Sequence, residues 1–425
     1  MQQSTEDRPE SDQEDAAPLL NQQLSLGKGL CSARYSLVLI LHFSLFMMYS
    51  LRVNLSIAII AMTNGTNPGS LPNSSTDVCP NRSHAQPNGS HREFTQGAPV
   101  YDWSAETQGV ILSAFFYGYL FTQLLGGYWS GQFGGKLVLG YGLLSTSALT
   151  LLVPLAAGLG AAYLIGLQAL LGMAEDALLG PSSPSLQLES SASTWGGLTS
   201  STSSGISHGR SLPLLAMIKS LPLWAIAVPC FCSEWLFYTL LTSMPMYMHE
   251  VLHFDIRENG LLAALPYIGN WLCTIVSGVL ADFLLSKQVF SIATVRKLFS
   301  VLGMMLPAIS LVAVSYVGCD YRAAVVFLTL SMTVISMCGA GFYTNHMDIA
   351  PRYAGFVLGV TNTLGTVSGI IAPAAVGFFT SQDLLTGWRN VFCVSAALNL
   401  FGPLFYVTFG SGTIQDWARE DTALQ

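Results

Sequence analysis

Two similar stretches decide the fold: GYWSGQFGGK at residues 127–136 and GVLADFLLSK at residues 278–287. They share a leading glycine and a closing lysine, and only the second has an acidic residue at its fifth position; the residues are Gly127, Lys136, Gly278, Lys287 and Asp282. Each stretch ends an apolar segment. Similar helix ends at equivalent places indicate that the chain is built from two related halves, as many transporters are.

The composition around these stretches is that of a polytopic membrane protein. Of 425 residues, 51% are hydrophobic and 10% are charged, against roughly 25% charged residues in an average soluble domain. The net charge of −7 comes with no basic cluster, which excludes nucleic-acid binding. The sequence has no CxxC spacing, GxxxxGK[ST] loop or nucleophile–His–acid set, so we expect no metal, cofactor, ATP hydrolysis or enzymatic activity.

Apolar segments long enough to cross a bilayer, about 20 residues each, can be counted along the chain. There are ten, near 35–61, 108–129, 137–155, 160–179, 221–245, 259–284, 298–317, 323–345, 353–379 and 389–409. The first is too long and too far from the N-terminus for a cleaved signal peptide. The sequence therefore predicts an all-α protein with about ten transmembrane helices.

Glycosylation acceptors and basic residues predict the orientation. The loop at 62–100 holds four Asn-x-Ser/Thr sequons, at Asn64, Asn73, Asn81 and Asn88. If this loop is lumenal, eleven basic residues fall on the cytosolic side and five on the lumenal side, in agreement with the positive-inside rule. Both termini are then cytosolic.

Two helices are missing from the first half. Only four predicted spans separate the two glycine-led stretches, where six would complete two equivalent halves. The segment at 181–212 instead holds twelve serines in 32 residues, too few apolar side chains to offset the entropy of folding. The predicted regions are an acidic cytosolic tail (1–34), an incomplete N-terminal bundle (35–180), a cytosolic linker (181–218), a six-helix C-terminal bundle (219–410) and a cytosolic tail (411–425).

Several motifs resemble those of a known family. They include YSLRVNLS at 49–56, WSAETQG at 103–109, FFYGY at 115–119, LPLWAI at 221–226, FYTLL at 237–241 and NHMDIAP at 345–351. Together with the two glycine-led stretches, they are similar to the lysosomal and vesicular organic-anion transporters of the major facilitator superfamily. The resemblance covers about 31–179 and 214–417.

The resemblance implies a function, partners and a location. It implies proton-coupled export of sialic acid or a related organic anion, and the sequence does not separate proton from sodium or chloride coupling. The partners are then the anion, the coupling ion and the lipid bilayer. Asp15, followed by Leu19 and Leu20, resembles an acidic dileucine signal that binds sorting adaptors. We expect a lysosomal or vesicular membrane, with the plasma membrane as the alternative.

Three of the charged residues within predicted spans are candidates for transport chemistry. Arg52 suits capture of a planar carboxylate by its guanidinium group, with Tyr49 one helical turn earlier; the alternative is an arginine that reaches the lumenal interface. Glu175 is a candidate for proton coupling, although Gln168 and Leu171 replace the family's arginine and first glutamate; the alternative is an exposed helix end formed with Asp176. Glu234 is a second candidate.

Other residues have open interpretations. Tyr117, Tyr119 and Tyr238 either line a substrate cavity or simply pack between helices. We expect His346 and Asp348 to cap a cytosolic helix end. Cys79 and Cys319 fall in lumenal loops, where a disulfide can form.

A second hypothesis follows from the missing helices and from Gln168. The chain would then be a truncated relative that does not transport, with a regulatory role or as a minor isoform.

Overall fold

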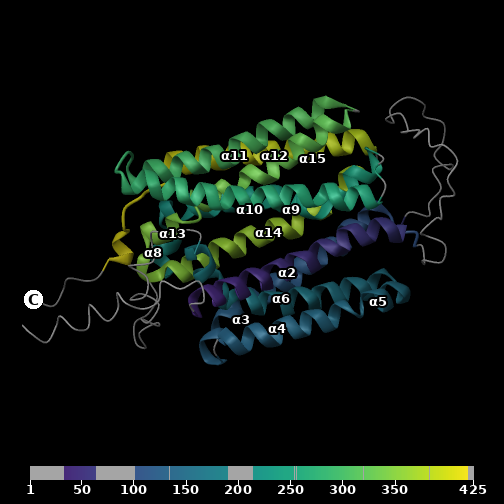
Figure 1. The fold of residues 1–425 in the computed structure, drawn as a ribbon, viewed down its shortest axis with the longest axis horizontal. Helices are drawn as coiled ribbons and strands as arrows, with labels where there is room; N and C mark the ends of the chain where they lie inside the picture. Colours follow the sequence, from purple (N-terminus) through teal and green to yellow (C-terminus); the bar gives the residue numbers. More distant parts are fainter. Residues whose placement is uncertain are drawn as a thin grey trace, which may run out of the picture. The chain divides into compact units, whose positions relative to one another are not determined.

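The computed structural model describes residues 33–63, 101–133, 135–189, 214–252, 254, 256–318, 320–381 and 383–419. By its packing the chain divides into two units, Met1–Met47 and Met48–Gln425. In the first unit, the described residues form the beginning of helix α2 (Ala33–Thr63). The remaining described residues belong to the second unit, and all their regular secondary structure is helical (Figure 1).

Each of the ten predicted spans contains a helix. After α2, the main helices are α3 (Ala105–Phe133), α4 (Gly135–Thr150), the short α5 (Val153–Leu159), α6 (Ala161–Glu189), α9 (Leu221–Glu250), α10 (Ile256–Ser286), α11 (Ile292–Val317), α12 (Tyr321–Val334), α14 (Ala354–Thr380) and α15 (Leu384–Phe409). Within the described residues, six helices are long and apolar enough to cross a membrane, or seven with one bent pair. The predicted number of ten remains a prediction.

Two predicted spans are interrupted. The span at 137–155 is a pair of helices, α4 and α5, that meet at an angle of 43°. Pro154 lies in the first turn of α5, and proline cannot continue a helix because it lacks the N–H group and clashes with the preceding turn. The span at 323–345 is also interrupted: α12 continues as a 3-10 helix, η2 (Ile335–Gly339), and a turn precedes the short helix α13 (Asn345–Ile349).

The helical ends differ from the predicted linker boundaries. Helix α6 continues to Glu189, and a short helix, α8, covers Leu214–Ile218. Helix α6 therefore extends into the predicted linker at 181–218, and α8 lies entirely within it. The predicted linker therefore has helical residues at both of its ends.

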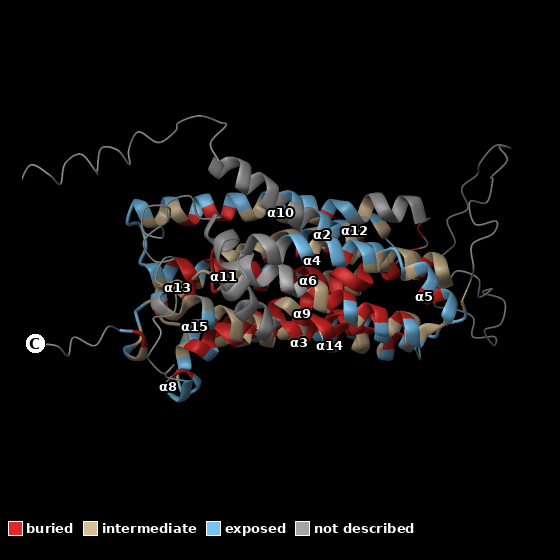
Figure 2. Ribbon diagram, turned by 90° about the horizontal axis from the view of Figure 1, so that it is seen from below, coloured by how far each residue is buried: buried red, intermediate tan, exposed pale blue. Residues whose placement is uncertain are grey.

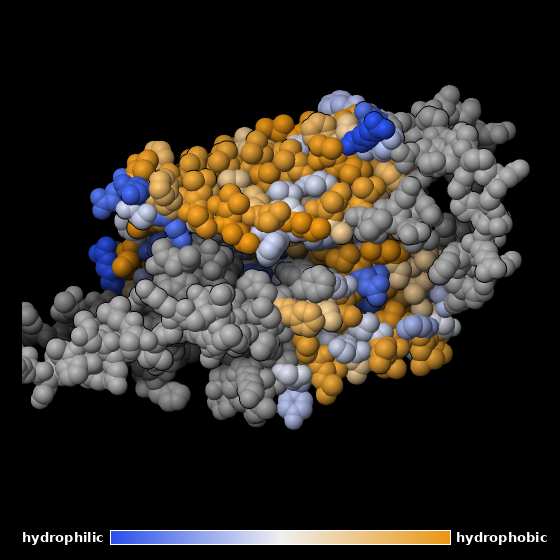
Figure 3. Space-filling view, in the orientation of Figure 1, coloured by the Kyte–Doolittle hydropathy of each residue, from blue (hydrophilic) through white to orange (hydrophobic). Residues whose placement is uncertain are grey.

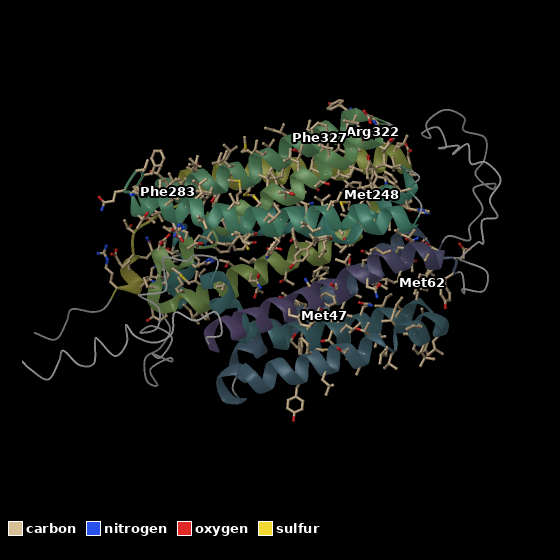
Figure 4. All side chains as sticks on the ribbon, viewed as in Figure 1. Met47, Met62, Met248, Phe283, Arg322 and Phe327 are labelled. Carbon is tan, nitrogen blue, oxygen red and sulfur yellow. The ribbon has the colours of Figure 1, made fainter. Side chains whose placement is uncertain are left out.

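Within the second unit, the helices differ greatly in burial. Helix α9 is a central helix, with 72% of its most apolar window buried, whereas α10 has 17% (Figure 2). Apolar side chains cover much of the visible surface of the described helices, as expected for contact with lipid (Figure 3). Phe283 near the end of α10 and Arg322 at the start of α12 lie at opposite ends of these helices (Figure 4).

Within the second unit, helix α14 packs against both α3 and α9. Glycines allow its close approach to α3: a Cβ at Gly109 would lie 2.6 Å from the carbonyl oxygen of Pro373, and one at Gly377 would lie 2.6 Å from that of Ala105. Helix α3 also packs closely on α6. These contacts bring α3, α6, α9 and α14 around the charged residues described below.

The C-terminal segment packs back onto α13. The backbone N–H of Gln415 donates to the carbonyl of Ile349 (2.9 Å), and the amide of Asn345 donates to the carbonyl of Ser411 (3.0 Å). The ring of Trp417 lies 6.3 Å from that of Tyr353. The beginning of the predicted C-terminal tail, up to Arg419, is therefore part of the folded protein.

Candidate functional site

Arg52 and Glu175 form an ion pair inside the protein. The Nη2 atom of Arg52, on α2, lies 2.8 Å from Oε1 of Glu175, on α6, and the side chains are only 7% and 3% exposed. Two charges can be removed from water to this extent only when they neutralise each other and are hydrogen-bonded. The side chain of Arg52 is therefore buried in the protein and not exposed at its surface, and Glu175 does not belong to an exposed helix end.

Three aromatic rings of α3 surround the guanidinium group of Arg52. Its Cζ atom lies 4.5 Å from the ring centroid of Phe115, 5.8 Å from that of Phe116 and 5.3 Å from that of Tyr119. Aromatic faces attract a cation, most strongly where water is excluded. The three rings therefore stabilise the charge of Arg52 in addition to its ion pair with Glu175.

Close packing between α3 and α6 creates this arrangement. A Cβ atom at Gly172 would collide with the carbonyl oxygen of Phe115, and one at Gly118 would collide with that of Ala169. Only glycine permits such an approach of two backbones. The two glycines thus bring the rings of α3 next to the carboxylate of Glu175, three residues beyond Gly172.

A cavity of about 190 Å³ opens beside the ion pair. It is lined by Arg52 and other residues of α2 together with Phe115, Phe116, Gln168, Leu171 and Glu175. The spacing of 168, 171 and 175 places these three residues on one face of α6. Gln168 and Leu171, which replace the arginine and first glutamate of the resembling motif, therefore line the same cavity as Glu175.

Glu234 lies on α9 and is held by two tyrosines. The hydroxyl of Tyr343, in the turn before α13, donates to its carboxylate, and Tyr238 also forms a hydrogen bond with it. Tyr238 packs edge-on against Phe116, with ring centroids 4.5 Å apart. Phe116 thus contacts both the guanidinium group of Arg52 and Tyr238, one of the two tyrosines that hold Glu234.

The capping prediction for His346 and Asp348 is wrong. His346 is buried, with Nε2 2.7 Å from Oγ1 of Thr361 and its other nitrogen bonded to the carbonyl of Tyr343. Burial lowers the pKa of His346 to about 4. Asp348 forms an ion pair with Nε of Arg296 at 2.8 Å. Both side chains make tertiary contacts that helix-end statistics do not reveal.

The other predicted site residues are placed as follows. None of the three predicted tyrosines is among the residues that line the cavity beside Arg52. Tyr119 and Tyr238 are buried and pack between helices, whereas Tyr117 is 55% exposed. Gly278 is buried and Asp282 is partly buried on α10. The side chains of Tyr49, Gly127, Lys136 and Asp176 lie outside the described residues, as do Asp15, Leu19, Leu20, the four sequons, Cys79 and Cys319.

Sequence reasoning missed Phe115, Phe116 and Tyr343. The first two belong to the FFYGY motif, where we singled out only the tyrosines, although aromatic residues near an intramembrane arginine are a signal for cation–π contact. Tyr343 lies 109 residues from its partner Glu234, and no sequence pattern connects them. In the described ranges, no group of three or more His, Cys, Asp or Glu side chains is placed to hold a metal ion.

The comparisons with known proteins identify the family of the chain. The Major Facilitator Superfamily model matches residues 190–373. Sialin from Homo sapiens is 39% identical over 459 aligned positions, covering 92% of each chain. The probable small intestine urate exporter from Homo sapiens is 39% identical and covers 93% of each chain; sodium-dependent phosphate transport protein 3 from Mus musculus is also 39% identical, over 93% of this chain and 97% of its own.

The alignments and the solved structures add two facts. The 459 positions aligned with human sialin exceed the 425 residues of this chain, so the alignment includes positions at which this chain has no residue. A bacterial homologue of the human lysosomal transporter Spinster, in its inward-facing and occupied conformation, has a similar fold. The TM-score is 0.58 at 11% identity, over 91% of this chain and 99% of that one.

Proposed function

Since the chain belongs to the major facilitator superfamily, within the group of anion transporters that includes sialin, we propose that it is a secondary active transporter that couples proton flow to export of sialic acid or a related organic anion. It is a membrane transporter and not an enzyme. Its relatives are named for sialic acid, urate and phosphate transport. The observation that carries the proposal is the buried ion pair between Arg52 and Glu175.

In this proposal, Glu175 occupies the anion site when no substrate is bound. The guanidinium group of Arg52 can hold a carboxylate by two parallel hydrogen bonds, and Glu175 already provides one carboxylate oxygen at 2.8 Å. A substrate carboxylate must therefore compete with Glu175 for Arg52. Protonation of Glu175 removes its charge and favours the substrate.

This competition couples the two fluxes. A buried Arg52 without an anionic partner is costly, so Glu175 loses its proton most easily when the substrate has left. The protein then binds the anion and the proton together and releases them together. Coupling of this kind requires only that the two states differ in affinity for each ligand.

The first experiment tests uptake of labelled sialic acid into vesicles with an imposed pH gradient. Glu175→Gln, which mimics the protonated form, should retain exchange of sialic acid while losing net uptake driven by the gradient. Arg52→Lys should weaken uptake strongly, because lysine keeps the charge but loses the bidentate geometry. Glu106→Gln, at an exposed position on α3, is the matched control.

Other substrates and ions are tested in the same vesicles. Uptake of urate, phosphate, aspartate and glutamate under proton, sodium and chloride gradients identifies the anion and the coupling ion. Proton-driven uptake of sialic acid that persists in both Glu175→Gln and Glu234→Gln would reject coupling through these carboxylates.

The location within lysosomes or vesicles is part of the proposal. It is supported by the dileucine resemblance at Leu19 and Leu20 and by the similarity to sialin. Replacing both leucines with alanine should move the protein to the plasma membrane, as seen by surface labelling. Retention in lysosomes would show that this signal is not used.

A second candidate function is a truncated relative that does not transport. The aligned positions at which this chain lacks residues favour it. If the purified, folded chain binds sialic acid without catalysing exchange, this hypothesis replaces the transporter.

A further inference from the structure

Glu234 is a second carboxylate in the same region, and it has no cationic partner in direct contact. Within the described ranges it forms no ion pair, and its hydrogen bonds come from the hydroxyls of Tyr343 and Tyr238. The side chain is partly exposed. Its aliphatic part faces α14, where a Cβ at Gly365 would lie 3.0 Å from Cγ of Glu234.

The groups around Glu234 suit a proton better than a metal cation. The Sγ atom of Cys230 lies 3.7 Å from the hydroxyl of Tyr343, and Oγ of Ser233 lies 3.4 Å from it. Thiols and phenol hydroxyls are poor ligands for sodium, which prefers several carboxylate, carbonyl or water oxygens. A proton needs only one carboxylate oxygen and one acceptor for the new O–H group.

Tyr343 can provide that acceptor. When Glu234 is ionised, the Tyr343 hydroxyl donates to the carboxylate. When Glu234 binds a proton, its own O–H can donate to the Tyr343 oxygen, and the Tyr343 hydroxyl hydrogen turns towards Ser233. The proton is gained without leaving a buried donor or acceptor unpaired, which would otherwise cost about 1–3 kcal/mol.

The charged and titratable groups that act on Glu234 come from four elements around it, and α14 contributes none of them. They are Arg52 of α2, Cys230 and Tyr238 of α9, Cys338 of η2 and Tyr343 of the following turn. Arg52 is the only cation among them, and Glu175 already pairs with it directly. With both carboxylates ionised, these three charged groups carry one net negative charge, which opposes the entry of an anion.

From this geometry we propose that Glu234 binds a second proton in each transport cycle, so that two protons accompany one anion. The inference rests on the proposed function. Protonation of Glu175 releases Arg52 to the substrate, and protonation of Glu234 removes the remaining negative charge near it. Tyr238 packs on Phe116, and Phe116 also contacts Arg52. Through these contacts the charge of one carboxylate affects the other.

The coupling ratio is measured from the accumulation of labelled sialic acid in liposomes that contain the full chain. The outside is one pH unit more acidic than the inside, and the membrane potential is clamped at zero. At equilibrium each coupled proton contributes a factor of about ten per pH unit. We expect the unmodified protein to accumulate sialic acid about hundredfold, and Glu234→Gln to accumulate it about tenfold.

Two further arms identify the site and the ion. Glu250→Gln removes the carboxylate at the end of the same helix and should leave the hundredfold accumulation unchanged. Replacing sodium with choline should also have no effect, whereas a loss of accumulation would assign the second cation to sodium and overturn the proposal.

The remaining outcomes separate this inference from the proposed function. The unmodified chain accumulating sialic acid only about tenfold, while Glu175→Gln loses gradient-driven uptake, would overturn the proposal of a second proton and leave the proposed function standing. This outcome does not depend on the folding of any Glu234 variant. About hundredfold accumulation that persists in Glu234→Gln moves the second proton elsewhere. No proton-driven uptake by the unmodified chain overturns both proposals.

Discussion

The ion pair between Arg52 and Glu175 makes a specific prediction about stability. Glu175→Leu leaves the charge of Arg52 buried without its counter-charge, and Arg52→Met does the same to Glu175. Removing one partner of a buried ion pair costs about 3–5 kcal/mol of unfolding free energy, and exposures of 7% and 3% place this pair in that class. The double variant removes both charges and should be close to the unmodified protein.

The assay is a double-mutant cycle, with the free energy of unfolding measured in detergent micelles near neutral pH. We expect the two single changes to be non-additive by about 3 kcal/mol or more. Asp416→Asn is the control, because it breaks an ion pair at the protein surface: the side chain of Asp416 is 93% exposed and that of Arg419 is 63% exposed. This change should lower the free energy of unfolding by less than about 1 kcal/mol.

The pH dependence gives an independent check. The isolated carboxylate in Arg52→Met can be neutralised by a proton, so its destabilisation should decrease on acidification, whereas that of Glu175→Leu should not. Additive single effects, or single effects no larger than that of Asp416→Asn, would show that the pair contributes little.

Three other predictions concern different parts of the molecule. Gly172→Ala should lower the free energy of unfolding by about 1–3 kcal/mol because the added methyl group collides with α3, while Gly166→Ala, with open space at the same helix, should not; equal effects would reject the close packing. Neutral His346 contributes stability that is complete above its unfolded pKa of about 6.5 and is lost as the pH falls towards its folded pKa of about 4. His346→Gln should therefore make the free energy of unfolding depend less on pH between these two values. An unchanged pH dependence would contradict the buried neutral form. Enzymatic deglycosylation should lower the apparent mass of the protein, replacement of all four sequon asparagines should remove that shift, and absence of a shift in glycosylating cells would reverse the predicted orientation.

The helices were predictable because membrane insertion imposes a simple pattern. A helix in lipid needs a continuous apolar stretch, and each of the ten stretches found in the sequence contains a helix. The interruption at Pro154 had a visible signal in the proline itself. The change from α12 to a 3-10 helix at Ile335 had none, because no proline lies there.

The site was only partly predictable. Arg52, Glu175 and Glu234 could be identified because charged residues in apolar spans are rare and functional. Their partners could not be identified, because Arg52 and Glu175 are 123 residues apart and meet only in the folded protein. His346 and Asp348 show the opposite error: a local pattern favoured capping, but tertiary partners from α14 and α11 decide their contacts.

The fold of the C-terminal segment has a practical consequence for protein engineering. Residues 411–418 are hydrogen-bonded to and packed against α13 and its neighbours, and Ala418 is buried. A purification tag or fluorescent reporter joined at residue 410, directly after the last long helix, would delete this segment and leave Trp417's neighbour Tyr353 uncovered. A tag or reporter joined after Arg419 keeps these contacts, so expression trials should use the later junction.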